Sequence, residues 1–239
     1  MVPIAIAGIA LAFLAVELII QMIEAKQGKE VYGFFMPDPP MRVSDLPPNF
    51  SRMVSSLADF GINPPSNVFL HPGHTWAAVE GSGQARIGVT ALAGKAIGKI
   101  DGLVLPKPGQ TIRRGEKLFS LRQGHRTAEF VAPLSGTIRS VNEALAEGGA
   151  LDPSEWICKV QPENLSISIR ALKFAEDAVK WTYDELSKLQ ELVAMQIPRM
   201  QTVGATMQDG PLALDNLLEG LDDETWDMFQ ERFLKNSQN

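Results

Sequence analysis

The hydrophobic and polar positions divide the chain of 239 residues into five stretches, each with its own pattern. In chain order, a continuous apolar run gives way to a proline-rich connector and then to short apolar runs between Gly and Pro turns. Two stretches of helical periodicity follow. We therefore predict five parts: a transmembrane anchor at 1–25, a Pro-rich extended connector at 26–65, a β domain at 66–164, a long helix at 165–198 and an acidic helical tail at 199–239.

The apolar run at residues 2–23 would extend roughly 33 Å as a helix, which is enough to cross a bilayer. A cleavable signal peptide is the alternative, but it needs a basic n-region and a small-residue cleavage site, and neither is visible. Lys26, Lys29 and Arg42 follow the run, so the positive-inside rule places the N-terminus outside and the body in the cytoplasm. We therefore predict a single-pass protein of the bacterial inner membrane, cytoplasmic or intracytoplasmic, that contacts lipid through residues 2–23.

Glu17 is a carboxylate within this apolar run. Charged groups in a bilayer usually face protein or water, so one interpretation is a contact with another membrane subunit. The other is that Glu17, about two turns from the cytoplasmic end, reaches toward the interface or is protonated near it. Both interpretations make Glu17 a candidate partner or membrane contact.

Seven prolines between residues 33 and 65 exclude a long helix or a central strand there. We expect an extended connector that runs along a surface. Residues 49–60 have the spacing of a short amphipathic helix, with Phe50, Val54 and Leu57 on one side. This helix would bury its apolar side on the body of the chain or on a partner.

The β domain is predicted from seven short apolar runs separated by Gly and Pro turns, with a short helix at 90–97. Regular spacing of this kind is typical of a β-sandwich or a flattened barrel. The predicted strands are 76–80, 84–89, 102–105, 117–122, 127–132, 137–141 and 156–160.

Several motifs within residues 74–162 occur in a characteristic order. They are His-x-Trp at 74–76, Gly-Val-Thr before the short helix, Leu-Pro-x-Pro-Gly at 105–109, Gly-Glu at 115–116, and Ser-Gly followed by Val-Asn-Glu-Ala-Leu. In their order and spacing they resemble the H-protein of the glycine cleavage system, whose fold belongs to the biotinyl/lipoyl-domain group. The resemblance implies an H-protein-like, mainly β fold, to which this chain adds a transmembrane helix and C-terminal α-helices.

The predicted hairpin at 115–136 has a polar turn over residues 123–126. In the family that the chain resembles, a lysine on the corresponding hairpin carries lipoamide. Counting back from Gly136, the equivalent position is His125, with Arg126 beside it. Neither side chain can form the amide that lipoylation requires, so we expect that the lipoyl position is lost and that no cofactor is bound.

The net charge of −6 conceals two local concentrations of opposite sign. Between residues 107 and 126 there are six basic residues and one acid, whereas after residue 198 there are eight acids and three bases. The tail could dock on a partner or fold back on the basic hairpin. The candidate contacts with a partner or a membrane are Arg113, Arg114, Arg122 and Arg126 near the hairpin, and Trp226, Phe229 and Phe233 in the tail.

Residues 170–196 place apolar residues at alternating spacings of three and four, which predicts one long amphipathic helix that ends before Pro198. Its seam packs either on the β domain of the same chain or on another protein. The candidate partner contacts on this seam are Leu172, Val179, Leu186, Leu189 and Val193.

The candidate chemistry is sparse. His71 and His74 form an HPGH pair, but a metal site normally gathers three or four ligands. Cys158 is unpaired within an apolar run and is expected to be an inert core thiol. There is no nucleophile and base pair, no phosphate-binding loop and no redox motif, so we expect no catalytic site, no metal and no nucleic-acid partner.

Together these features predict a non-catalytic scaffold or assembly subunit of a larger membrane complex, with a degenerate lipoyl-domain body on the cytoplasmic face. The layout resembles that of the H subunit of photosynthetic reaction centres, which favours a bioenergetic complex and partners among its subunits. The alternatives are a membrane-tethered lipoyl or acyl carrier and an adaptor of the membrane-fusion type.

Overall fold

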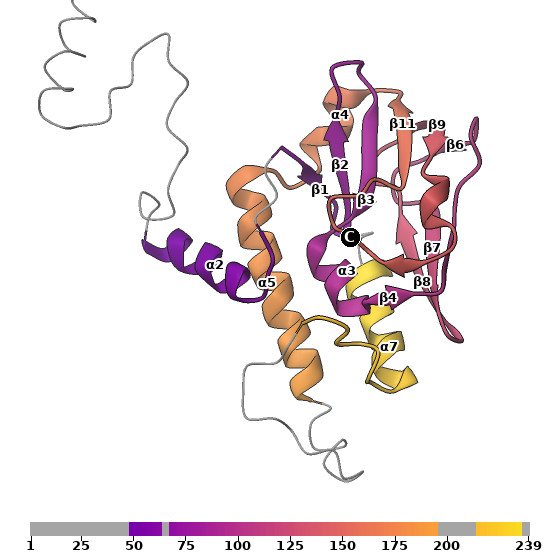
Figure 1. Ribbon diagram of the computed structural model, residues 1–239. Helices are drawn as coiled ribbons and strands as arrows, with labels where there is room; N and C mark the ends of the chain where they lie inside the picture. Colours follow the sequence, from indigo (N-terminus) through magenta and orange to yellow (C-terminus); the bar gives the residue numbers. More distant parts are fainter. Residues whose placement is uncertain (1–47, 64–66, 196–213, 236–239) are drawn as a thin grey trace, which may run out of the picture. The chain divides into compact units, whose positions relative to one another are not determined.

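The computed structural model describes residues 48–63, 67–195 and 214–235, which all belong to one compact unit, Pro47–Asn239 (Figure 1). The predicted membrane anchor, including Glu17, lies outside these described residues. No helix in the described part of the chain combines the length and the apolar character that crossing a membrane requires.

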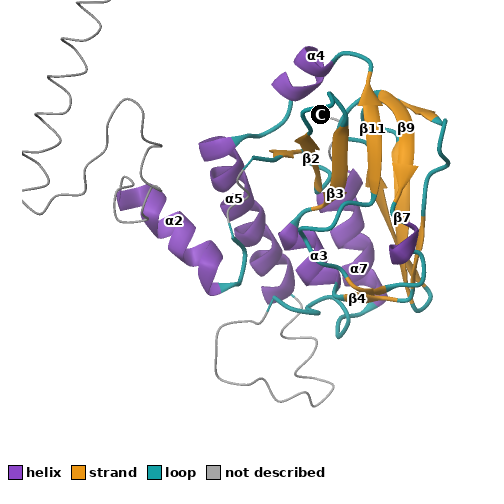
Figure 2. Ribbon diagram, turned by 45° about the horizontal axis from the view of Figure 1, so that its top comes forward, coloured by secondary structure: helices purple, strands orange, loops and turns teal. Residues whose placement is uncertain are grey.

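The centre of the described unit is β structure (Figure 2). A six-stranded antiparallel sheet has the order β1-β2-β3-β11-β9-β6, a three-stranded sheet has the order β5-β7-β8, and β10 pairs with β4. The strands of the largest sheet are β1 (Phe69–Leu70), β2 (Thr75–Val79), β3 (Ala85–Val89), β11 (Cys158–Pro162), β9 (Gly136–Val141) and β6 (Thr111–Ile112). The others are β5 (Gly102–Val104), β7 (Lys117–Gln123), β8 (Arg126–Val131), β4 (Lys99–Ile100) and β10 (Gly149–Ala150).

The core of the β domain is built from strands that are buried on both faces, since β2 and β7 each have four consecutive buried residues and successive side chains point to opposite faces. On β7 and β8, Phe119 and Phe130 are almost fully buried, and their stacked rings lie 5.2 Å apart between centroids. Ile87 on β3 and Ile138 on β9 are equally buried. The prediction of a mainly β domain followed by C-terminal helices is thus confirmed.

The hairpin formed by β7 and β8 ends in a two-residue turn. Gln123 pairs with Arg126 across the ladder, which leaves Gly124 and His125 as the turn. Gly124 has a φ of 59°, a conformation that is easy for glycine and costly for most other residues. The predicted turn over residues 123–126 is therefore present.

The predicted continuous helix at 170–196 is interrupted. Helix α4 (Leu165–Arg170) and helix α5 (Ala175–Ala194) are separate, because Lys173 exchanges two backbone hydrogen bonds of 2.8 Å with Leu70 of β1. These bonds extend the chain between the two helices and prevent a continuous helical ladder.

Helix α5 buries its apolar side within this chain. Val179, Leu186, Leu189 and Val193 are at most 6% exposed, and Leu172 before the helix is 8% exposed. Helix α2 (Pro48–Asp59) packs against α5, and both views show the two side by side (Figures 1 and 2). The amphipathic helix predicted at 49–60 is therefore present and lies on the chain's own helix.

The described C-terminal part consists of residues 214–222, helix α7 (Asp223–Phe229) and a π-helix, η3 (Gln230–Lys235). We call residues 214–235 the C-terminal segment. It packs on β8 through η3 and on α5 through α7. Trp226, Phe229 and Phe233 are each at most 2% exposed, so these predicted partner contacts are buried inside the chain. The remaining helices are α3 (Ala91–Ile97) and a 3₁₀ turn, η2 (Glu143–Leu145).

Candidate functional site

The turn of the β7–β8 hairpin is fixed against β4 and the loop that follows it. The Gln123 side-chain amide donates hydrogen bonds to the carbonyl oxygens of Ile97 and Lys99, at 2.7 and 2.8 Å. The backbone N–H of Gly124 donates to Asp101 Oδ2 at 2.5 Å. These bonds tie the tip of the hairpin to its own domain and set the direction in which His125 and Arg126 project.

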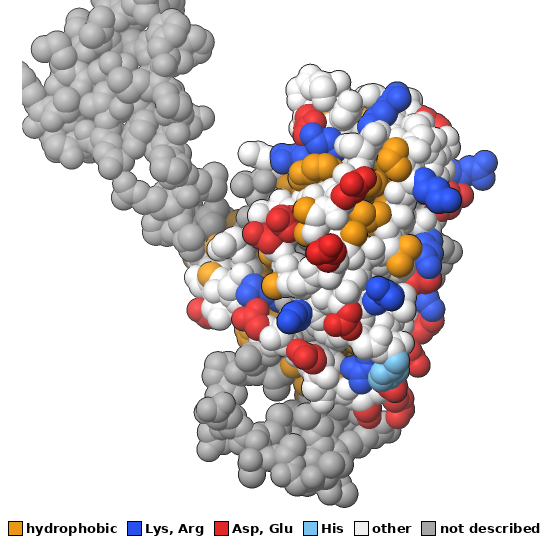
Figure 3. All heavy atoms as spheres, turned by 45° about the vertical axis from the view of Figure 1, so that its right-hand side comes forward, with side chains coloured by type: hydrophobic (Ala, Val, Ile, Leu, Met, Phe, Trp, Pro, Cys, Tyr) orange, Lys and Arg blue, Asp and Glu red, His pale blue; other side chains and the backbone are white. Residues whose placement is uncertain are grey.

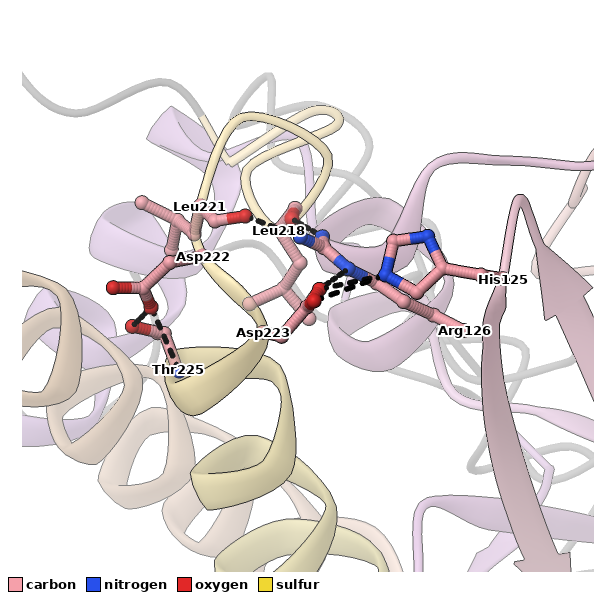
Figure 4. Close-up of polar contacts among 7 residues, drawn as sticks. All are labelled: His125, Arg126, Leu218, Leu221, Asp222, Asp223 and Thr225. Carbon is pink, nitrogen blue, oxygen red and sulfur yellow. Dashed lines mark hydrogen bonds and ion pairs between the residues drawn. The ribbon is translucent and has the colours of Figure 1, made fainter.

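Arg126 connects the hairpin turn to the C-terminal segment (Figure 4). Its Nε donates to Asp223 Oδ1 at 2.7 Å, while Nη1 and Nη2 donate to the carbonyl oxygens of Leu218 and Leu221 at 3.1 and 2.6 Å. The guanidinium also lies over the ring of Trp226, 5.5 Å from its centroid. With 14% of its side chain exposed, Arg126 is largely covered by the segment that it binds.

His125 contacts the same carboxylate from the solvent side. Its Nε2 lies 3.0 Å from both carboxylate oxygens of Asp223, and 74% of its side chain is exposed. The hydrogen bond to His125, followed by the one to Arg126, lowers the pKa of Asp223 below its usual value. Asp223 is therefore an anion at neutral pH, bound by two adjacent residues of the turn.

The position of Asp223 follows from local helix signals. Asp222 is the N-cap of α7, and its Oδ1 accepts hydrogen bonds from the backbone N–H and the hydroxyl of Thr225, at 2.9 and 2.6 Å. Asp223 and Glu224 then occupy the first turn, where acidic side chains stabilise the helix dipole. The cap fixes the start of α7, and the start of α7 places Asp223 against the hairpin.

A second set of contacts joins the C-terminal segment to α3. Backbone N–H groups of Asn216 and Leu218 donate to the carbonyl oxygens of Lys95 and Ala96, both at 2.8 Å. These carbonyls lie in the last turn of α3, where helices lack internal partners. The approach is close enough that a Cβ on Gly98 would lie 2.1 Å from Asn216 Oδ1, so only glycine fits there.

The basic residues predicted around the hairpin are not gathered at one place. Arg113 and Arg114 precede β7, whereas Arg126 follows the turn at the far end of this seven-residue strand. A strand of that length extends roughly 20 Å, so the two groups lie at opposite ends of the hairpin. Arg122 and both early arginines are exposed. Figure 3 shows acidic and basic side chains interspersed over this side of the molecule.

Lysine amines are absent from the turn itself. Lys99 lies on β4, where its carbonyl oxygen accepts from the Gln123 side chain, and Lys117 is the first residue of β7. Lys117 Nζ is hydrogen-bonded to Glu129 on the neighbouring strand, and it lies a strand length from the turn.

His71 is held as a neutral acceptor. It is 1% exposed, and its Nδ1 accepts a hydrogen bond from the backbone N–H of Gly73 at 3.0 Å. Burial, with smaller contributions from the charges of Arg114 and His74, lowers the pKa of His71 to about 4.

His74 lies in a separate enclosed environment. Its Nδ1 is 3.0 Å from Thr90 Oγ1 and its Nε2 is 3.6 Å from Glu185 Oε2, while Trp181 and Phe233 pack near the ring. Burial acts to raise the pKa of Glu185, but the hydrogen bonds and charges of His74 and Lys188 outweigh it and lower the pKa. Among the described residues, no group of three or more His, Cys, Asp or Glu is arranged to hold a metal ion.

Sequence patterns alone did not identify three groups of this site: Asp223 and the carbonyl oxygens of Leu218 and Leu221. The available signal was the opposite charge of the hairpin and the tail, which allowed folding back as one of two alternatives. The structure shows the folded-back arrangement.

Comparisons with known proteins agree on one family. A family profile described as "Glycine cleavage H-protein" matches residues 69–185. A probable glycine cleavage system H protein of Thermococcus gammatolerans is 35% identical over 112 residues, which cover 45% of this chain and 84% of that protein. The glycine cleavage system H protein of Geobacillus thermodenitrificans is 34% identical over 110 residues, covering 44% and 86%. A crystal structure of an H protein from Mycobacterium marinum superposes with a TM-score of 0.41 at 25% identity, covering 49% of this chain and 98% of that one.

These comparisons contradict the prediction of a membrane scaffold. The relatives are named as glycine cleavage H proteins, not as subunits of photosynthetic or other membrane complexes. The part of the chain that the structure describes also holds no helix suited to crossing a bilayer. The predicted function, the inner-membrane localisation and the membrane partners rested on residues 2–23 and an architectural analogy, and these predictions are wrong.

Proposed function

Because the chain belongs to the glycine cleavage H-protein family, we propose that it is a family member that works through protein contacts and carries no lipoyl group. In this proposal the chain is not itself an enzyme, and its partners are proteins of a glycine cleavage system. The observation that supports it most directly is the occupation of the hairpin turn by the C-terminal segment, through Arg126.

The chemistry of the turn does not fit a lipoyl group. A stable lipoyl amide requires a primary amine, and the turn offers the imidazole of His125 and the guanidinium of Arg126. A guanidinium remains protonated in proteins and is a poor nucleophile. The residues present therefore do not fit the group that the family is known for, and we assign it no role in this chain.

The geometry of the turn supports the proposed role in protein contacts. The equivalent position, His125, is 74% exposed and paired with Asp223, while the neighbouring Arg126 is 14% exposed and binds two backbone carbonyls and a carboxylate of the same chain. The turn and the C-terminal segment form one composite surface, in which exposed His125 and Asp223 are paired. We infer that partners meet this charged composite surface in place of a mobile arm.

Lipoylation in vitro tests the absence of a carrier. The full chain is incubated with lipoate, ATP and a lipoate ligase, and its intact mass is compared with that of the Thermococcus gammatolerans relative under the same conditions. We expect no mass increment on the wild-type chain. His125→Lys should gain one lipoyl group, because that side chain is 74% exposed. An increment that maps to a native lysine, for example Lys99 or Lys117, would overturn the proposal.

Direct binding tests the second half of the proposal. The wild-type chain is titrated with each of the other glycine cleavage proteins of its own organism by isothermal titration calorimetry. We expect saturable binding to at least one of them, weakened when the composite surface is changed by Asp223→Lys. A wild-type chain that binds none of these proteins, while its melting midpoint shows it to be folded, would contradict this half alone.

A further inference from the structure

A cavity of about 490 Å³ lies beside β2 and β3. Its lining includes neither the turn residues 123–126 nor any residue of the C-terminal segment. It lies between the loop that follows α2, the strands β2 and β3, and α3. Cavities that hold small ligands in proteins typically measure about 300–1,000 Å³. The size is therefore that of a small-molecule site.

The interior of this cavity is mostly apolar. Ile62, Leu70, Trp76 and Leu92 line it and are each at most 6% exposed. The Trp76 ring is held in place by a hydrogen bond from its Nε1 to the carbonyl oxygen of Pro153, at 3.1 Å. A fixed aromatic ring among aliphatic side chains is a suitable surface for the hydrocarbon part of a ligand.

Two cationic side chains, Arg86 and Lys95, and one carboxylate, Asp152, also line the cavity. Asp152 Oδ1 accepts hydrogen bonds from the backbone N–H and the hydroxyl of Ser154, at 2.8 and 2.7 Å. The Arg86 side chain is 43% exposed and forms an ion pair with Glu80, with Nε 3.3 Å from Oε1, while the Nε atom itself is buried and makes no hydrogen bond. Lys159 Nζ donates a hydrogen bond to the same oxygen at 3.0 Å, so the Glu80 carboxylate is shared between Arg86 and Lys159. Arg86 thus retains hydrogen-bonding capacity and positive charge that an incoming anion would satisfy.

One wall of the cavity lies outside the region that the family profile matches. Residues 61–63 contribute to the lining and precede the region matched by the family profile, which begins at residue 69. Helix α2, which leads into this wall, packs on α5. The cavity therefore arises where a segment outside the family region closes over the β domain.

From these observations we propose that the cavity binds a small amphipathic anion, a carboxylate on an aliphatic or aromatic body. The carboxylate pairs with Arg86, and the body packs against Trp76 and Leu70. Lys95 contributes further positive potential, although it is paired with Asp215 at 2.7 Å. The site is separate from the hairpin turn, so the proposal does not depend on the function proposed above.

Calorimetry on the full chain tests the site, with decanoate as the probe and decanol as its uncharged counterpart. We expect one decanoate per chain, bound at least about tenfold more tightly than decanol, since a charge-assisted contact contributes on that scale. Arg86→Gln should remove this preference and leave decanol binding unchanged. Equal binding of the two probes to the wild type would overturn the assignment of an anion.

A cavity-filling variant tests the location. Ala78 lines the cavity and is 8% exposed, so Ala78→Phe should reduce decanoate affinity at least about tenfold. Val104→Phe is the matched control, because Val104 lies outside the cavity lining and is 54% exposed, and it should bind like the wild type. Should Ala78→Phe prove unfolded by circular dichroism, Leu92→Trp replaces it. Binding that survives filling of the cavity in a folded variant, or no decanoate binding by the wild type, would refute the proposal.

Discussion

Replacing Arg126 by methionine should weaken the docking of the C-terminal segment on the hairpin while leaving the β domain folded. Methionine preserves most of the apolar stem of the side chain and removes all of its donors. The carbonyl oxygens of Leu218 and Leu221 and the carboxylate of Asp223 would each lose a partner. Because these bonds join Arg126 to the C-terminal segment and not to the β sheets, the effect should be confined to the segment.

The magnitude follows from the two carbonyl contacts. A hydrogen bond from a charged donor contributes about 1.5–3 kcal/mol, and two bonds made by one guanidinium are not additive. The pair with Asp223 is exposed to solvent and screened, so it is left out of the sum. We expect the free energy of docking to fall by about 3 kcal/mol, which corresponds to about a 100-fold shift in the opening equilibrium.

Amide hydrogen exchange measures this shift directly. The backbone N–H groups of Thr225 and Trp226 are bonded to Asp222, so they report on the start of α7. Their protection should fall by about 100-fold in Arg126→Met and remain close to wild type in His125→Ala, because His125 is exposed and meets only Asp223. Equal losses of protection in the two variants, or a loss below about threefold in Arg126→Met, would refute the assignment.

Three further predictions concern the core. The pKa of His71 is about 4 in the folded chain and 6.5 in the unfolded chain, so protonation of His71 favours unfolding. The free energy of unfolding should therefore fall by about 3 kcal/mol between pH 6.5 and pH 4, as measured by urea titrations. The fall should be smaller in His71→Asn, whose side chain keeps an acceptor for the backbone N–H of Gly73. An unchanged slope in that variant would contradict this role. Burial raises the pKa of the Cys158 thiol to about 12, so iodoacetamide at pH 8 should modify it only in denaturant, and rapid labelling of the native chain would count against its burial. Gly136→Ala places a Cβ 2.2 Å from the Gln161 carbonyl oxygen and should lower stability by about 1–3 kcal/mol, whereas Gly81→Ala, in open space, should be neutral by the same chemical denaturation.

The longer strands could be predicted because their signals are local. Short apolar runs at 117–122 and 127–132, with a polar, Gly-containing turn between them, predicted the hairpin to within one or two residues. The two-residue strands β1, β4, β6 and β10 were missed, since they exist only through pairing with distant residues. The break between α4 and α5 has the same origin: Lys173 bonds to Leu70, and no pattern near residue 173 reveals that partner.

The sequence predicted which charges the hairpin and the tail carry, but not which acidic residue of the tail contacts Arg126. Local charge counts showed a basic hairpin and an acidic tail, yet four acids at 222–224 and 227 are equivalent by sequence. Which of them meets Arg126 depends on the capping of α7 by Asp222 and on the docking of residues 216–218 at the end of α3. The added N-terminal run misled the functional prediction, because hydropathy alone cannot assign a membrane complex.

The contacts that cover the hairpin turn have a consequence for how the chain folds. Arg126 and its partners are separated by 92 to 97 positions in sequence, and Lys95 and Asp215 by 120. Closing such long loops costs entropy before any contact forms, so long-range pairs tend to form slowly. The β domain, whose hairpin is local, can assemble before residues 214–235 join it. We therefore expect a growing chain to expose the hairpin turn until residues 214–235 have been synthesised and have docked on it.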